Sequence, residues 1–306
     1  MFDKESCRLV QGAIDSPLSM LLLTVLLTSQ TWGMSSRSPR RNSSQYKGES
    51  RQSSYTKTKS KSSSSSSSGS SYSSSKAKLR IGDVFQYQLD GSIRNHNVDV
   101  VFVDVFDTSS STISSLKKQG KVVVCYFSAG TAENWRSDYG RIPASAKGRS
   151  VDGWSGEKWM DIRRSDVVSL SRSRIDKARS KGCDGVDPDN VDVYDNSSGF
   201  SISSTDVKNY LRNLAAYSHS RGLLMGLKNS AEIASYMSAY TDFAVVEECF
   251  QWNECGSYSS FISRKKPVFI VEYRSYSSSL CSNAKSRKMS LIFADEDLDG
   301  SISYCR

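Results

Sequence analysis

Eight short apolar segments of the sequence end in, or are followed directly by, side chains that can carry a charge, move a proton or offer an amide. In chain order these side chains are Asp90; Asp104 and Asp107; Tyr126 and Ser128; Asp187, Asp189 and Asn190; Lys228 and Asn229; Glu247 and Glu248; Glu272 and Tyr273; Asp295 and Glu296. One such residue at a strand end is commonly a solvated loop charge. A run of eight indicates one shared site, because the carboxyl ends of parallel strands meet at one edge of a sheet.

The acids in this set favour glycoside hydrolysis over other reactions. Two carboxylates suffice, because one protonates the leaving oxygen while the other attacks the sugar or activates water, so no metal or cofactor is needed. A Ser-His-Asp triad is disfavoured, since His96 lies in a short connection and His219 in a helical segment. The sequence has no glycine-rich phosphate loop, and it has neither the Cys-x-x-Cys pair nor the histidine cluster of a zinc site. We therefore expect no cofactor and no metal.

Side-chain alternation along a strand limits which acids can reach the site together. Asp187 and Asp189 share one face if their strand continues past Pro188. Glu247 and Glu248 point to opposite faces, so only one of the two is expected in the site. The sequence does not say which one.

The elements that must position these side chains follow from the hydrophobic pattern. The eight apolar segments are continuous rather than alternating, which is typical of strands buried on both faces of a parallel sheet. They span Val84–Leu89, Val98–Val105, Val122–Phe127, Cys183–Asp187, Leu223–Leu227, Phe243–Glu247, Val268–Glu272 and Leu291–Ala294. Helical patterns lie between most of them, at Ser109–Gln119, Val167–Lys181, Thr205–Arg221, Asn229–Tyr240, Tyr258–Arg264 and Ser277–Arg287.

Eight strands with intervening helices predict an α/β fold of the (β/α)8 TIM-barrel type. The alternative, a doubly wound open sheet, has less support because no Gly-x-Gly-x-x-Gly motif follows the first strand. One connection is unusual. Only Asp90–Asn97 joins the first two strands, which is short for a parallel crossover and leaves room for a single helical turn.

The net charge of +9 belongs to a tail and not to the predicted barrel. Residues 34–80 contain 11 Lys and Arg side chains against the single Glu49, whereas residues 81–306 contain 28 basic and 28 acidic side chains. Residues 34–75 include 21 serines, a composition typical of a disordered linker. We therefore divide the chain into an N-terminal segment (1–33), a disordered Ser/Lys/Arg-rich linker (34–80) and a catalytic domain (81–306). A nucleic-acid partner is not expected.

The N-terminal segment suggests export. The apolar run Leu18–Leu27 is too short for a membrane span but fits the core of a signal peptide, with a signal anchor at residues 18–29 as the alternative. Cleavage would leave six cysteines, an even number that is consistent with three disulfides in a secreted protein. Proximity in sequence suggests the pairs Cys249–Cys255 and Cys281–Cys305.

Tryptophans add a second feature of carbohydrate sites, because sugar rings stack on aromatic side chains. Trp135, Trp154 and Trp159 lie between the third and fourth predicted strands, and Trp252 follows the sixth. Core packing explains a tryptophan at least as often, so the sequence leaves both interpretations open for each.

The strand-end motifs resemble glycoside hydrolase family 114, the endo-α-1,4-polygalactosaminidase-like barrels, in the order that this family has. The matching stretches are Phe85–Gly91, Val122–Thr131, Glu133–Arg136, Trp154–Glu157, Trp159–Arg163, Gly182–Asn190, Gly226–Asn229 and Asp242–Gln251. The resemblance implies hydrolysis of α-1,4-linked galactosamine polymers. It also implies Asp189 and Glu247 as the catalytic pair. We assign Asp189 as the nucleophile and Glu247 as the acid/base, and we expect endo action. We expect retention of configuration, which a carboxyl separation of about 5–5.5 Å would indicate, with inversion as the alternative at about 6.5–9.5 Å.

We place other strand-end residues at the substrate, either in contact with it or behind the residues that contact it. We expect substrate binding by Asp90, Asp104, Tyr126, Asp187, Lys228, Asn229, Glu272 and Asp295. A polysaccharide that is cationic or partly acetylated suits a site rich in acids. We expect a secreted monomer. The alternatives are an inactive barrel that only binds polysaccharide and a glycosidase for another α-linked glycan.

Overall fold

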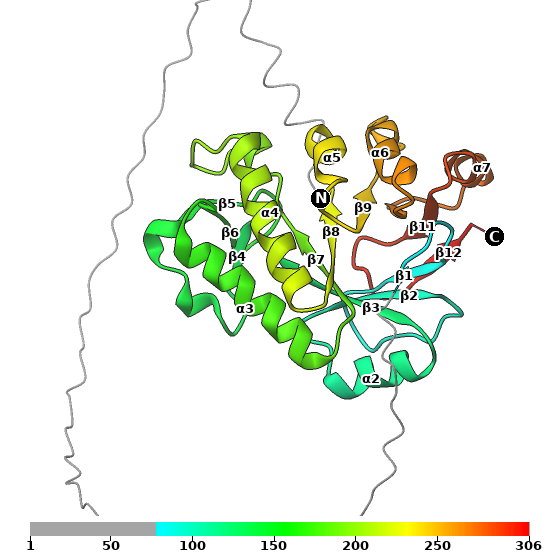
Figure 1. The fold of residues 1–306 in the computed structure, drawn as a ribbon, viewed down its shortest axis with the longest axis horizontal. Helices are drawn as coiled ribbons and strands as arrows, with labels where there is room; N and C mark the ends of the chain where they lie inside the picture. Colours follow the sequence, from blue (N-terminus) through cyan, green and yellow to red (C-terminus); the bar gives the residue numbers. More distant parts are fainter. Residues whose placement is uncertain (1–77, 306) are drawn as a thin grey trace, which may run out of the picture. The chain divides into compact units, whose positions relative to one another are not determined.

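The eight apolar segments form eight parallel strands in the computed structural model, which describes residues 78–305 (Figure 1). The strands are β1 (Phe85–Tyr87), β2 (Val100–Asp104), β3 (Val122–Ser128), β7 (Gly185–Asp189), β8 (Leu224–Lys228), β9 (Phe243–Glu247), β10 (Val268–Glu272) and β11 (Ser290–Ala294). Each strand pairs in parallel with the next along this order, and a short strand β12 (Ile302–Tyr304) lies antiparallel on β11. The predicted TIM-barrel fold is confirmed.

The barrel closes between its first and last parallel strands through loop contacts. Ser290 donates its hydroxyl to the Asp83 carbonyl at 2.8 Å, and the Leu89 N–H donates to the Leu298 carbonyl at 3.0 Å. Gln88 is fully buried, and its amide donates to the carbonyls of Asp90 and Asp299 at 2.9 Å. The first bond joins the start of β11 to the segment before β1, and the bonds to Leu298 and Asp299 attach the loop after β11 to the end of β1.

Six helices cover the barrel at the positions that the hydrophobic pattern predicts. They are α2 (Ser110–Lys118), α3 (Ser165–Lys181), α4 (Ser204–Ser220), α5 (Ala231–Met237), α6 (Ser259–Ser263) and α7 (Ser278–Ser286). Their boundaries follow local chemistry: Ser203 and Asp206 form a capping box at the start of α4, and Gly182 ends α3 with a φ of +93°. The connection Asp90–Asn97 contains no helix, so the room for a helical turn is not used.

Two apolar layers use the two faces of the strands. The inner layer fills the barrel with side chains such as Phe85, Phe102, Phe243 and Phe269, whose ring centroids lie 4.9–6.1 Å apart. The outer layer packs the alternate residues of the same strands against the helices. Continuous apolar strands therefore reflect burial on both faces, as the sequence pattern predicts.

A small antiparallel sheet lies between β3 and α3, and the sequence pattern did not predict it. It consists of β4 (Thr131–Glu133), β6 (Glu157–Met160) and β5 (Lys147–Ser150) in the order β4-β6-β5. Two short 3-10 helices, Tyr139–Arg141 and Ala144–Ala146, lie between β4 and β5, and two others, Val193–Asp195 and Cys255–Tyr258, follow β7 and β9. Trp159 is buried in this sheet, with 6% of its surface exposed, so here core packing is the correct interpretation.

Three disulfides connect the six cysteines of the described residues. Cys249–Cys255 and Cys281–Cys305 pair as sequence proximity suggests, and Cys125–Cys183 joins β3 to the segment that enters β7. The last bond closes the longest loop, with a sequence separation of 58 residues, so it restricts the unfolded chain most.

The predicted N-terminal segment (1–33) and almost all of the linker (34–80) lie outside the described residues. Across residues 78–305, no helix has the length and apolar character that a membrane crossing requires.

The packing inside the barrel predicts that Gly226 accepts no larger residue. A Cβ atom at Gly226 would lie 2.4 Å from the Phe243 ring. We expect Gly226→Ala to lower the free energy of unfolding by about 1–3 kcal/mol, measured by urea denaturation. Gly140→Ala is the control, since a Cβ there meets nothing within 4 Å. Equal stability of the two variants would contradict this account of the inner layer.

Candidate active site

Three strands end in polar side chains that face inward and lie close together. They do so at the carboxyl end of the barrel, which we call the mouth. On β7, Val186 belongs to the outer layer, so Asp187 and Asp189 both face inward, and the strand continues through Pro188. On β9, Val245 faces inward and so does Glu247. The chain leaves the strand at Glu248, which has a φ of +52°. Glu247 is therefore the acid of this pair that reaches the site.

Lys228 joins the two carboxylates that the family resemblance singles out. It ends β8, and its ammonium Nζ lies 3.0 Å from Asp189 Oδ2 and 2.9 Å from Glu247 Oε2. Its side chain is 1% exposed. Burial alone would lower the pKa of Lys228, but the three carboxylates around it raise that pKa above its ordinary value. The lysine is therefore a fixed positive charge between two acids.

Glu247 also accepts hydrogen bonds from two neutral donors. Asn229 donates its amide to Glu247 Oε2 at 3.0 Å and accepts the Glu247 backbone N–H at 2.9 Å. Tyr273 donates its hydroxyl to Glu247 Oε1 at 2.5 Å. Burial would raise the pKa of Glu247, but Lys228 and these donors hold it below its ordinary value. In the unliganded site Glu247 is ionised at neutral pH.

Asp189 is oriented by the residue that follows it. The backbone N–H of Asn190 donates to Asp189 Oδ1 at 2.7 Å, and Asn190 itself has a positive φ of 56°. The Asn190 side chain donates to Ser128 Oγ at 3.1 Å and to Thr131 Oγ1 at 3.3 Å. Both oxygens of Asp189 are thus bound, one by Asn190 and one by Lys228.

Two residues behind Asn190 were not expected in the site. Thr131 donates its hydroxyl to Glu157 Oε1, and Asn190 Nδ2 lies 3.4 Å from the same oxygen. Burial raises the pKa of Glu157. A Cβ atom at Gly130 would lie 1.6 Å from the Asn190 carbonyl oxygen, so only glycine permits this contact. Thr131 and Glu157 both lie in motifs that resemble the family, so the sequence contained a signal for them. Their contact with Asn190, however, depends on the small sheet that the sequence pattern did not predict.

Asp187 lies below Asp189 and Glu247, which Lys228 bridges and which we call the bridged pair. Asp187 is fully buried. Tyr87 donates its hydroxyl to Asp187 Oδ2 at 2.9 Å, whereas Asp187 Oδ1 has no hydrogen-bond partner. Burial raises the pKa of Asp187 from 3.8 to about 7, in spite of the nearby ammonium of Lys228. Asp187 therefore retains its proton at mildly acidic pH.

The remaining predicted substrate-binding residues divide into two groups. Tyr126 faces inward, and Lys228 Nζ lies 5.8 Å from the centre of its ring. Asp90 and Asp295 are exposed on the loops after β1 and β11. These three residues remain compatible with substrate contact.

Two other predicted residues have partners away from the bridged pair. Asp104 is 2% exposed, accepts the backbone N–H of Phe106 at 2.7 Å and pairs with Arg136 at 2.7 Å. Glu272 follows the outward alternation of β10, accepts the Phe250 N–H at 2.9 Å and pairs with Arg274 at 3.3 Å. Both hold loops in place, and the structure does not bring them into contact with Asp189 or Glu247.

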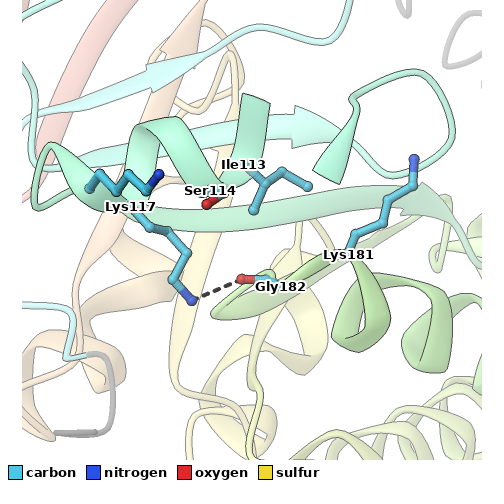
Figure 2. Close-up of a pocket in the computed structure, with 6 residues that line it drawn as sticks. Ile113, Ser114, Lys117, Lys181 and Gly182 are labelled. Atoms are coloured by element: carbon cyan, nitrogen blue, oxygen red, sulfur yellow. Dashed lines mark hydrogen bonds between the residues drawn. The ribbon is translucent and has the colours of Figure 1, made fainter. Parts of the chain in front are cut away.

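The hollow shown in Figure 2 is lined by none of the three residues Asp189, Lys228 and Glu247. It has a volume of about 380 Å³ and is bounded by α2 and the C-terminal end of α3. Lys117 donates to the Gly182 carbonyl at 2.8 Å and pairs with Asp184 at 2.7 Å, so this ammonium serves the fold. Within the described part of the chain, no group of three or more His, Cys, Asp and Glu side chains is placed to hold a metal ion.

Comparison with known proteins identifies the family. The sequence model of glycoside hydrolase family GH114 matches residues 66–306. The chain belongs to this family. It is therefore a glycoside hydrolase, as the resemblance predicts. The crystal structure of Ega3 from Aspergillus fumigatus, solved as a complex with galactosamine, is 35% identical with a TM-score of 0.72. That match covers 77% of this chain and 100% of Ega3.

A second solved structure supports the fold alone. The glycoside hydrolase domain of PelA from Pseudomonas aeruginosa is 15% identical to this GH114 chain, with a TM-score of 0.56. The match covers 72% of this chain and 97% of the PelA domain. A search of the curated proteins gives no match.

The shared ammonium predicts how Glu247 titrates when Lys228 is removed. In Lys228→Met the buried carboxylates lose their common cation, so their repulsion and desolvation are expected to raise the pKa of Glu247 above its ordinary value. The measurement is carboxyl 13C NMR of glutamate-labelled protein, with Glu247→Gln identifying the resonance. Lys121→Met is the control, since Lys121 is 8% exposed and bonds to the His96 carbonyl elsewhere. An unchanged Glu247 titration in Lys228→Met would contradict the electrostatic role.

The buried acid below the pair predicts a pH dependence of stability. Folding raises the pKa of Asp187 to about 7, so between pH 4 and pH 7 the unfolded chain has released a proton that the folded chain retains. The contribution of Asp187 to the free energy of unfolding is full below about pH 4 and is lost as the pH rises to 7. Asp187→Asn is expected to reduce this decline, measured by urea denaturation across the range. The same slope in Asp187→Asn and in the unmutated chain would contradict the argument.

Proposed function

We propose that this chain is a secreted, monomeric endo-glycosidase that hydrolyses α-1,4-galactosaminidic bonds in a polysaccharide. The observation that supports this most is the pair Asp189 and Glu247, held at the mouth of a GH114 barrel by one buried lysine. Ega3, which is 35% identical, was solved with galactosamine bound. Three disulfides agree with export, because such bonds form in oxidising compartments.

The spacing of the pair favours a retaining mechanism. Because both carboxylates bind the same Lys228 ammonium, their bonded oxygens lie within about 6 Å of each other. Retaining glycosidases place their carboxyl groups about 5–5.5 Å apart, whereas inverting ones need about 6.5–9.5 Å to accommodate a water molecule. In the proposed first step, Asp189 attacks the anomeric carbon while Glu247 gives a proton to the leaving oxygen. Water, deprotonated by Glu247, then cleaves the glycosyl ester and frees Asp189.

The charges of the unliganded site suggest an acidic optimum for this reaction. Glu247 must carry a proton to act as the acid, yet its pKa lies below the ordinary value. The protonated fraction therefore grows as the pH falls. Asp187 keeps its own proton at mildly acidic pH and therefore adds no negative charge. While Glu247 is ionised, the carboxylates of Asp189 and Glu247 together exceed the single positive charge of Lys228 by one, which leaves a net negative charge. That charge favours the approach of a sugar with a free ammonium group.

The proposal is tested by incubating the full chain with de-N-acetylated and N-acetylated galactosaminan and analysing the products by mass. We expect early products of several lengths from the de-N-acetylated polymer, faster release near pH 5 than pH 7, and retained configuration by proton NMR. Asp189→Asn and Glu247→Gln should each reduce the rate by at least about 10⁴-fold without loss of folding.

Glu248→Gln is the matched control, because Glu248 has left the strand and is not part of the bridged pair. It should cleave as the unmutated chain does. Full activity in Asp189→Asn or Glu247→Gln would overturn the assignment of the pair. Binding of the polymer without any product would favour the alternative of an inactive polysaccharide-binding barrel, and cleavage of another α-linked glycan alone would overturn the substrate.

A further inference from the structure

Two tryptophans are among the most exposed large apolar residues of the described chain. Trp135 is 52% exposed and Trp154 is 61% exposed. They lie in the turns that flank the small sheet, where Trp135 follows β4 and Trp154 precedes β6. Exposed indoles are unfavourable in water, and neighbouring ones commonly mark a binding surface. We call Trp135 and Trp154 the indole pair.

The two turns that hold the indole pair are fixed against each other. The Asn134 backbone N–H donates to the Gly156 carbonyl at 3.0 Å, which places the residue before Trp135 beside a residue two positions after Trp154. Gly156 has a φ of +88°, and a Cβ atom there would lie 2.7 Å from the Asn134 side chain. Only glycine allows this conformation and this approach at little cost. The indole pair is therefore displayed on a structured surface.

The same two strands connect the indole pair to Asp189. Thr131 begins β4 and Glu157 begins β6, and both contact Asn190, whose N–H orients Asp189. Trp154 precedes Glu157 by three residues, so even a fully extended chain keeps their Cα atoms within about 10 Å. The small sheet thus extends from the support of the catalytic carboxylate to the indole pair.

We propose that Trp135 and Trp154 form a binding subsite for the polysaccharide chain a few sugar units away from the bond that is cleaved. This inference rests on the proposed function. An indole face can stack on the C–H face of a sugar ring, and tryptophan is the strongest of the aromatic side chains in attracting a cation to its face. The ligand it favours is therefore an amino sugar with a free ammonium group.

The pattern of cation–aromatic contacts agrees with this ligand. In the described residues, lysines and arginines of the chain itself stack on several other rings, as Arg136 does over Phe106 at 4.9 Å and Lys147 over Tyr139 at 3.9 Å. Neither member of the indole pair has such a contact among residues 78–305. Asp152 is exposed in the turn that leads to Trp154 and adds a negative charge there.

The test measures binding separately from cleavage. The full chain with Glu247→Gln is titrated with de-N-acetylated and with N-acetylated galactosaminan by calorimetry, alone and with Trp135→Ala, Trp154→Ala or both. We expect about fivefold weaker binding of the de-N-acetylated polymer for each substitution and about 20-fold for both, with a smaller loss for the N-acetylated polymer. Tyr236→Ala is the control, because Tyr236 is 41% exposed on α5, and it should leave both affinities unchanged.

A second measurement uses the chain with Glu247 intact. Substitution of both tryptophans should lower kcat/KM on the de-N-acetylated polymer through KM while leaving kcat/KM on the shortest cleaved oligosaccharide unchanged. Thermal melting verifies that each variant folds. Unchanged polymer affinity in the double variant overturns the subsite while leaving the proposed function intact, and equal losses for both polymers overturn the recognition of the ammonium group.

Two further outcomes would also overturn the subsite. If the chain with Glu247→Gln binds neither polymer and the unmutated chain cleaves neither, the proposed function fails together with the subsite. If the double variant keeps its polymer affinity but loses self-association in sedimentation velocity, the indole pair is a contact between two copies of the chain.

Discussion

The site depends on one buried ammonium group. Lys228 lies between Asp189 and Glu247 and bonds to both, so it holds two like charges close together in a region from which water is largely excluded. Burying three charges is costly, and removing the central cation would leave two unpaired carboxylates. The same contact lowers the pKa of Glu247 and fixes one oxygen of Asp189. Geometry and protonation in this site are therefore consequences of a single interaction.

The barrel provides the rigid frame for this interaction. Asp189, Lys228 and Glu247 end three consecutive strands, β7, β8 and β9, and each shares its inward face with the apolar layer below. That layer leaves no freedom for a strand to slide, because a shift by one residue would turn each polar end outward. The small sheet adds a second support, since Thr131 and Glu157 hold Asn190, and Asn190 orients Asp189.

Much of the fold could be predicted from the sequence because its signals are local. Strands and helices follow from apolar runs, caps and glycines, and those elements appear within a few residues of their expected positions. The small sheet was missed because its strands are only three or four residues long and gain stability from neighbours distant in sequence. Asp104 and Glu272 were expected to contact substrate, since their positions at strand ends look the same in sequence as that of Asp189. In the structure, Asp104 forms an ion pair with Arg136, and Glu272 forms one with Arg274.

The sequence by itself determined the barrel, the family and a set of strand-end acids that contains Asp189 and Glu247. Its hydrophobic periods and motifs are properties of contiguous residues, so they can be recognised without coordinates. Only the tertiary structure decided that Glu247 faces the site and Glu248 does not, that Lys228 bridges the pair, and that Trp159 is buried while Trp135 and Trp154 are exposed. The reason is physical. Charge pairing, burial and pKa depend on distances between residues far apart in the chain, and only the complete packing of the barrel sets those distances.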